Sequence, residues 1–172
     1  ETGVWTTAAN QGDKITVQIA KLTGGATFTP MIEVLSPIGA SLGISSGSVA
    51  ARLDIQAGAS GTYKVVVSDA HQTGTATYRV RLAQVPGTFT VPAGDEGGAL
   101  TNGTTHSGTI DVGDLDQWTV SANQGDRLTL QIAKTAGGAA FTPIIELFSP
   151  DGTRLGVDSG GIAARLDAQA EA

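Results

Sequence analysis

Cysteine is absent from the 172 residues, and histidine occurs only twice. These absences exclude a disulfide framework, a Cys-based metal site, a zinc site and a Cys–His dyad. Only 15% of the residues are charged, the ten basic ones are scattered, and the net charge is −6. This balance argues against a nucleic-acid groove or an anionic membrane surface as partner. No apolar run reaches the roughly 18 residues that a membrane-spanning helix needs, so we expect no membrane insertion.

Recognisable catalytic motifs are also missing. The sequence has no Gly-x-Ser-x-Gly motif, and its glycines occur singly or in pairs at expected turns rather than in a phosphate-binding loop. No pair of carboxylates is identifiable as a glycosidase site. We therefore predict that the protein is not an enzyme.

Glycine is abundant, with 24 residues, about twice the usual share of roughly 7%. Hydrophobic residues make up 40%, which is enough for a packed core. Low charge, many glycines and regularly spaced apolar residues indicate an all-β protein with many tight turns rather than a disordered chain.

The central feature is an internal repeat. The segment from Trp118 to Lys134 has a near copy from Trp5 to Lys21, displaced by 113 positions, and 35 of 59 positions are identical between residues 1–59 and 114–172. Such similarity is typical of units that repeat in tandem.

Alternation of apolar and polar residues predicts short strands throughout each copy. In the first copy the expected strands lie at residues 5–9, 14–21, 29–35, around 42–44, 49–55, 61–67 and 76–82. The segments Asn10–Asp13 and Ser36–Gly39 separate them and have turn composition. In the second copy, His106–Val112 reads as an additional first strand. No segment has a helical apolar stripe, so we predict an antiparallel, jelly-roll-like β-sandwich in tandem repeats of about 113 residues.

The predicted domains are residues 1–83, a linker at 84–105 rich in Pro and Gly, and residues 106–172. By this division the first repeat lacks its first strand and the second lacks its last two. Two interpretations remain open: more of the same chain completes the units, or another chain adds strands to an open edge.

The order of short motifs resembles the bacterial pre-peptidase C-terminal (PPC) domain. The motifs are Ser107-Gly108-Thr-Ile, Gly113-Asp114-Leu-Asp116, Trp118, Gly125, Pro150-Asp-Gly152, Gly61-Thr-Tyr63 and Gly74-Thr-Ala-Thr-Tyr78. This resemblance implies a jelly-roll-like accessory domain of secreted prokaryotic proteins. It extends to calcium-binding modules of secreted collagenases, in which an acidic segment before the first strand and an acidic turn after it supply the ligands.

The resemblance makes calcium the candidate cofactor. The residues that match the two acidic segments are Asp95, Glu96, Asp111, Asp114 and Asp116, with Asn102 nearby. Calcium prefers six to eight oxygen ligands, which these side chains can partly provide. The alternative is that Asp114 and Asp116 only cap a turn by accepting backbone N–H bonds. In the first copy, Glu1-Thr2-Gly3 stands in place of Asp114-Leu115-Asp116, so the acidic set is not repeated.

Trp5 and Trp118 alternate with polar or small residues, so we expect them to lie in the core rather than to form a carbohydrate platform. The favoured function is a non-catalytic structural repeat of a secreted or cell-surface protein, part of a filament or stalk. Its partners would be neighbouring copies of itself, through strand complementation or head-to-tail contacts. The alternative is a calcium-dependent accessory module of a secreted enzyme or adhesin that binds extracellular matrix or polysaccharide.

Overall fold

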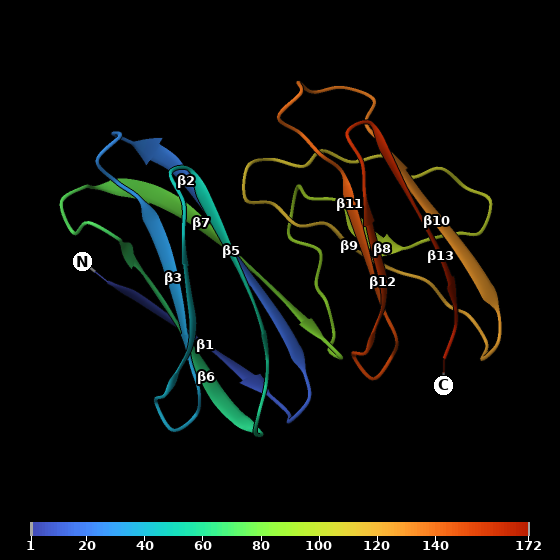
Figure 1. The fold of residues 1–172 in the computed structure, drawn as a ribbon, viewed down its shortest axis with the longest axis horizontal. Helices are drawn as coiled ribbons and strands as arrows, with labels where there is room; N and C mark the ends of the chain where they lie inside the picture. The colour runs from blue at the N-terminus through green and yellow to red at the C-terminus, as the bar shows by residue number, and fades with distance from the viewer. Residues whose placement is uncertain (1, 172) are drawn as a thin grey trace. The chain divides into compact units, whose positions relative to one another are not determined.

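The computed structural model describes residues 2–171, so Glu1 and Ala172, and with them the expected outer limits of the two repeats, lie outside the described residues. The described part of the chain is all β and contains no helix (Figure 1). Its strands are β1 (Gly3–Ala9), β2 (Lys14–Gly24), β3 (Pro30–Leu35), β4 (Ser41–Ser46), β5 (Ala50–Gln56), β6 (Gly61–Asp69), β7 (Ala76–Val85), β8 (Gly97–Ala99), β9 (Gln117–Thr119), β10 (Arg127–Ala133), β11 (Ile144–Phe148), β12 (Arg154–Ser159) and β13 (Ala163–Gln169). Accordingly, residues 2–171 include no helix that could cross a membrane.

The chain divides into two compact units, unit 1 (Glu1–Val120) and unit 2 (Ser121–Ala172). The predicted linker at residues 84–105 belongs to unit 1 by its contacts, as does the segment up to Val120. Unit 1 therefore contains the whole first repeat together with the acidic segments named above.

Unit 1 contains two antiparallel sheets and one short parallel pair. The four-stranded sheet has the order β1-β6-β3-β4, the three-stranded sheet has the order β5-β2-β7, and β8 pairs with β9 in parallel. The central strands β2, β3 and β6 each have hydrogen-bonded neighbours on both sides. The outer strands β1 and β7 each have one strand partner among the described residues.

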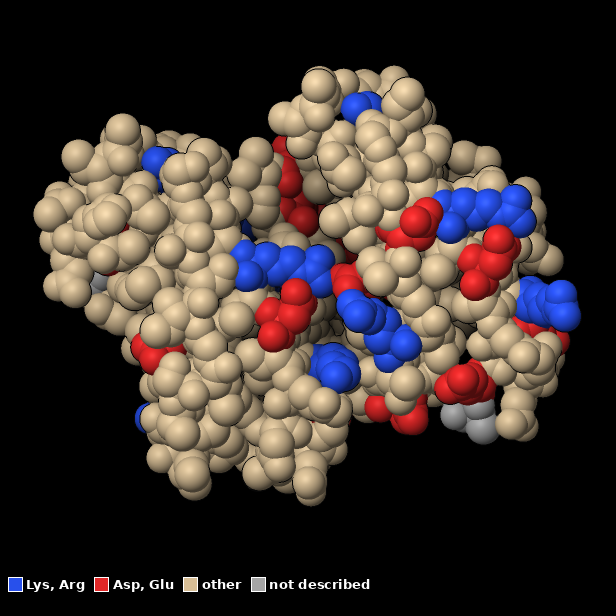
Figure 2. Space-filling view, viewed as in Figure 1, with Lys and Arg blue, Asp and Glu red and all other residues tan. Residues whose placement is uncertain are grey.

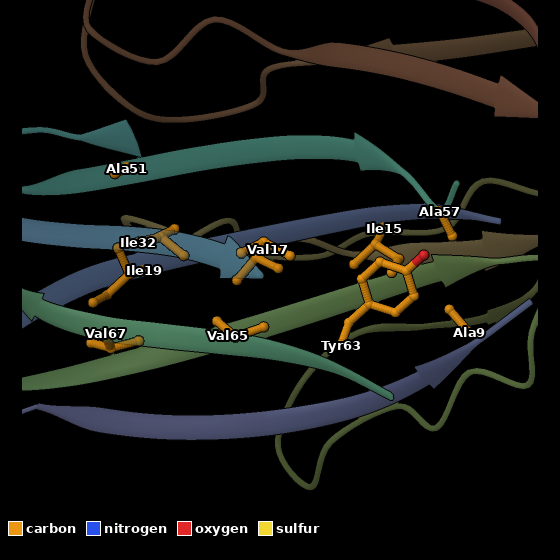
Figure 3. Close-up of a cluster of buried hydrophobic side chains, with 11 residues drawn as sticks. Ala9, Ile15, Val17, Ile19, Ile32, Ala51, Ala57, Tyr63, Val65 and Val67 are labelled. Carbon is orange, nitrogen blue, oxygen red and sulfur yellow. The ribbon is translucent and has the colours of Figure 1, made fainter. Parts of the chain in front are cut away.

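The core of unit 1 is built from the residues that alternation along the strands predicted to face inward. Ile15, Val17 and Ile19 of β2 are 0% exposed, and Ile32 and Val34 of β3 are equally buried. Figure 3 shows these side chains converging with those of β6 on the same cluster, with Tyr63 beside Ile15 and the small residues Ala9 and Ala57. Side chains at every second position of a strand share one face, and this cluster draws on β1, β3 and β6 of one sheet and on β2 and β5 of the other.

The predicted turns have the expected geometry. Gly12 ends the loop between β1 and β2 with φ 97°, a value that favours glycine. In the turn after β3, the Gly39 amide donates to the Ser36 carbonyl at 2.9 Å. The second copy repeats this bond from Gly152 to Ser149 at 3.0 Å. The local chemistry of the turns is thus the same in both copies.

Unit 2 reproduces part of unit 1 in the same register. β10 pairs with β13 as β2 pairs with β5, and β11 pairs with β12 as β3 pairs with β4. Even the register irregularity recurs, between Val34 and Leu35 in unit 1 and between Leu147 and Phe148 in unit 2. Within residues 2–171, however, unit 2 has only these two two-stranded sheets.

The prediction that Trp5 is a core residue is wrong, because Trp5 is 56% exposed. Trp5 pairs with the buried Val65, so its side chain does lie on the inward face of the sheet. β1 is an edge strand, however, with one strand partner among the described residues, and Trp5 stays largely exposed there. Trp118 is partly exposed, and its ring lies 5.2 Å from that of His106.

The predicted strand at His106–Val112 is also not formed. No strand lies between Ala99 and Gln117, and Ile110 and Val112 are 37% and 58% exposed. Apolar alternation gives a segment the capacity to form a strand, but a strand also needs a hydrogen-bonding neighbour. Residues 106–112 pair with no strand within the described residues.

Candidate metal centre

The candidate site lies on the outward face of β7 in unit 1. Val80 of β7 is partly buried and packs against the core, so the flanking residues Arg79 and Arg81 point away from it. The chain then continues through residues 93–96 and 108–116, which face these two arginines. The site is therefore built from one rigid strand and two acidic loop segments.

Three of the five predicted acidic residues come together. Asp95, Asp114 and Asp116 each offer a carboxylate oxygen, and these atoms all lie within 4.8 Å of one another. Asp114 is buried, with 9% exposure, and the other two are partly buried. Three carboxylates at this spacing repel one another unless positive charge lies between them.

The two arginines supply part of that positive charge. Arg81 Nη2 lies 2.6 Å from Asp95 Oδ2, and Arg81 Nε lies 3.0 Å from Asp114 Oδ1. The second contact is an ion pair without hydrogen-bond alignment, because Nε has no hydrogen-bond partner. Arg79 Nη1 lies 3.6 Å from Asp114 Oδ2. Arg81 thus bridges Asp95 and Asp114 and leaves Asp116 without a direct ion pair among the described residues.

Asp116 is the member of the group whose negative charge is least compensated by hydrogen bonds and ion pairs. Its Oδ1 atom is buried and has no hydrogen-bond partner among the described residues. Burial raises the pKa of Asp116 to about 6, and the nearby charges of Asp95, Asp114 and Glu96 act in the same direction. Arg81 lowers this pKa, but by less than the other causes raise it. The group therefore holds more negative charge than its arginines balance.

The same carboxylates also cap the backbone. Asp95 Oδ1 accepts from the amide of Glu96 at 3.1 Å, and Asp114 Oδ1 accepts from the amide of Leu115 at 3.0 Å. The amide of Asp114 donates to the carbonyl of Asp111 at 3.0 Å, which closes a turn. The second oxygens of Asp95 and Asp114 face Arg81 and Arg79, so a cation at these two residues would have to share the carboxylates with the arginines, each carboxylate offering about four lone-pair sites.

The other predicted residues lie outside the group of three. Glu96 accepts from the amide of Thr109 at 3.2 Å and so joins the two loop segments. Asp111 Oδ2 lies 3.5 Å from Arg79 Nη2, and its side chain is 64% exposed. Asn102 lies in an exposed turn.

A polar hollow of ≈ 420 Å³ opens beside the carboxylates. It is lined by Arg79, Arg81, Ala93, Gly94, Asp95, Glu96, Thr109, Asp111 and Asp114. On the face of the protein shown in Figure 2, acidic and basic side chains stand singly or beside one another, and no basic patch forms. A small hard cation that takes oxygen ligands suits such a hollow better than an organic ligand, because its lining is almost entirely polar.

Arg79 and Arg81 are members of the site that were not predicted from the sequence. An available signal was their position two apart on one strand, with no acidic partner on that strand, followed by an acidic segment. Outward-facing arginines at this spacing can hold a loop against the sheet by paired charges. They are part of the site because they fix Asp95 and Asp114 in place.

No protein-family model matches the chain, and no curated protein sequence matches it. The function is therefore inferred from the geometry of the two units.

Proposed function

We propose that the protein is a non-catalytic structural repeat of a secreted or cell-surface protein, and that it assembles with other copies of the same unit. Each complete unit would be a jelly-roll-like β-sandwich of the PPC type, repeated about every 113 residues along the sequence. The unit would form part of a filament or a stalk. We propose no chemical reaction for it.

One observation carries this proposal. Unit 2 builds the same strand pairs as unit 1 in the same register, with β10 and β13 paired as β2 and β5 are, and β11 and β12 paired as β3 and β4 are. Structural units that recur in tandem contact neighbouring copies of themselves and build extended arrays.

Assembly can be tested by examining the purified chain over a range of concentrations. Multi-angle light scattering should give a mass that rises with concentration, and negative-stain electron microscopy should show elongated particles. A heterologous contact that does not close on itself gives this behaviour. Compact monomers at high concentration would contradict the proposal.

The acidic group of unit 1 favours a second candidate function, a calcium-dependent accessory binding module. Asp95, Asp114 and Asp116 would provide carboxylate ligands, with water or backbone carbonyls completing the six to eight oxygens that calcium prefers. A bound cation would offset the charge repulsion that raises the pKa of Asp116. In this function the cation would fix the segment that follows β7, and the module would attach to matrix or polysaccharide.

Calorimetric titration with calcium, and separately with magnesium, tests this candidate. Asp116→Asn should weaken calcium binding by about tenfold or more, because it removes a buried ligand. Asp111→Asn is the matched control and should change binding less, since Asp111 is exposed and lies outside the group of three. Equal loss in both variants, or no heat with either metal, would reject the module.

A further inference from the structure

A turn at residues 111–116, called the docking turn below, packs closely against the outward face of the β5-β2-β7 sheet. The point of closest approach is Ala20 of β2, which is buried although it lies opposite the outward-facing Arg79. A Cβ atom added to Gly113 would overlap the Cβ of Ala20 and lie 3.1 Å from both its Cα and its backbone nitrogen. No side chain fits between the two segments, and Gly113 also has φ 71°, so the contact requires glycine at this position.

Ion pairs hold the docking turn on the same face of the sheet. The carboxylate of Asp114 lies 3.0 Å from Arg81 Nε and 3.6 Å from Arg79 Nη1. Asp111 Oδ2 adds a weaker contact, 3.5 Å from Arg79 Nη2. Removing a carboxylate such as Asp114 from water is costly unless opposite charge stays beside it. The docked position of the turn therefore depends on the arginines of β7.

The two sides of this contact belong to different copies of the repeat. The displacement of 113 positions aligns Asp114 with Glu1, so the docking turn stands at the start of the second copy. Ala20, Arg79 and Arg81 belong to the first copy, whose expected range is residues 1–83. All of these residues lie within unit 1, so a single compact unit contains the contact between the two copies.

We propose that the outward face of β2 and β7 is a docking surface for the turn that opens the next repeat of the same chain. Consecutive repeats would then be joined by a packed contact instead of a free linker. This inference rests on the proposed function, because it names the contact between neighbouring copies. The partner is specified by its chemistry: a Gly-Asp turn whose glycine meets the strand backbone and whose aspartate meets two arginines.

The chain between the two copies is held at the same place. Arg81 Nη2 lies 2.6 Å from Asp95 Oδ2, so one arginine contacts both the connecting segment and the docking turn. Glu96 Oε2 accepts from the amide of Thr109 at 3.2 Å, which ties the connecting segment to the residues just before the turn. The connection is thus fixed to β7 at two points along its length.

The strand part of the docking surface is present in both copies. Ala133 of β10 is the counterpart of Ala20 of β2, and Gln131 is the counterpart of Gln18. Alanine is depleted in strands relative to larger β-branched residues. A small residue at the same outward position of both copies is what a surface that receives a glycine turn requires.

Hydrogen exchange on the whole chain tests the ion pairs. Arg81→Gln should speed exchange at the amides of Asp114 and Leu115 by at least about tenfold, because it removes the closest charge partner of Asp114. Arg52→Gln is the matched control, since Arg52 and Arg81 lie on either side of Gln18 on the same face and Arg52 pairs with Asp54. The control should leave exchange in the turn unchanged. Equal exchange in wild type and Arg81→Gln would overturn the inference.

A second variant tests the close packing without changing a charge. Ala20→Val suits a strand but adds bulk where Gly113 approaches, so the turn should be displaced while β2 stays protected from exchange. Chymotrypsin should then cleave after Leu115 about tenfold faster. Ala133→Val makes the same change at the equivalent position of β10 and should leave this cleavage unchanged. Equal cleavage rates in the two variants would reject the docking surface.

Both measurements should be made with calcium and with EDTA. Protection of the turn that is the same in the two conditions supports the arginine contacts, whereas protection that requires calcium would show that a metal holds the turn and that the inference is wrong. The result also separates this inference from the proposed function. Compact monomers with a protected turn would refute assembly and support the docking surface. Elongated particles with an unprotected turn would refute the docking surface and leave assembly intact.

Discussion

Ile19 and Ile132 are the same residue at equivalent positions of the two repeats. Ile19 lies on β2, which pairs with β5, and Ile132 lies on β10, which pairs with β13. Ile19 is 0% exposed, whereas Ile132 is partly exposed. Their own strands and their partner strands are nearly identical, with Ala51 and Ala164 directly opposite. What differs within residues 2–171 is the next strand along the sheet, because β2 also pairs with β7 whereas β10 pairs only with β13.

Interactions within the strand pairs and turns that both units contain, by contrast, are the same in both units. Thr16 donates to Asp54 at 2.6 Å, and the counterpart Thr129 donates to Asp167 at the same distance. Lys21 donates to the carbonyls of Gly25 and Phe28, and Lys134 repeats both contacts in unit 2. Local contacts thus depend on the sequence alone, and burial depends on whether distant strands are present.

The largest expected effect compares the two isoleucines directly. Ile19→Ala should lower the free energy of unfolding by about 2–5 kcal/mol, because it leaves a cavity in a closed core. Ile132→Ala should cost much less, since water already reaches its side chain. Urea unfolding followed by circular dichroism, with hydrogen exchange to assign the unit, measures both changes. Similar costs would mean that the open face of unit 2 is covered in solution.

A second comparison sets the loop after β6 against the loops that both units contain within residues 2–171. Asp69 accepts from the amides of Thr29, Thr73 and Gly74 at 2.8 Å each. These bonds, that of Thr29 first, hold the pKa of Asp69 well below its usual range.

Because the pKa of Asp69 is lower in the folded state than in the unfolded state, Asp69 stabilises unit 1 above its ordinary pKa and loses this effect as the pH falls below it. Asp69→Asn should lower the melting temperature of unit 1 at neutral pH. The difference from wild type should shrink when thermal unfolding is repeated below about pH 4. A difference that is independent of pH would show that the ionised form is not what stabilises the loop.

The third comparison uses the aspartates that close the loop before β2 and β10. Asp13→Ala should cost about 1–3 kcal/mol, since it leaves the partly buried side-chain amide of Gln84 without its acceptor. Asp126→Ala should cost less, because Asp126 is exposed and only caps the local turn. Chemical denaturation of both variants tests the difference. A reversed order would indicate that Asp126 has a buried partner in solution.

The smallest effect is expected at the exposed ion pairs. Arg52 Nε lies 2.9 Å from Asp54, and Arg165 Nε lies 3.0 Å from Asp167, both on exposed faces. Arg52→Ala and Arg165→Ala should each change stability by less than about 1 kcal/mol. The two changes should be alike, and thermal unfolding in low and high salt would detect them. A clearly larger loss of stability for one of the two variants would show that the contribution of its ion pair depends on contacts outside the local strand pair.

Much of the fold could be predicted from the sequence because alternation and turn residues act over short distances. The strands from Gly3 to Val85 and their inward residues follow the period of two, and the turns at Gly12 and Gly39 follow glycine chemistry. The prediction that Trp5 lies in the core was wrong because alternation indicates the face of a strand but not whether that face is covered. Its face is inward, but whether an edge strand is covered depends on the other sheet.

The candidate site shows the same limit. Acidic residues at 95, 96, 111, 114 and 116 could be selected from the sequence, and three of them converge. The ion pairs of Arg81 with Asp95 and Asp114 could not be selected, because they join a strand to two loop segments whose paths no local pattern specifies.

The segment around Trp118 separates the two kinds of information most clearly. Trp-Thr occurs at residues 5–6 and 118–119, and in both places the backbone is extended. The sequence by itself determined that extended state, through β-propensity and alternation. Only the tertiary structure decided the partner: β1 pairs antiparallel with β6, whereas β9 pairs in parallel with β8. The reason is that backbone N–H and C=O groups must be satisfied, and they bond to whichever strand lies within reach.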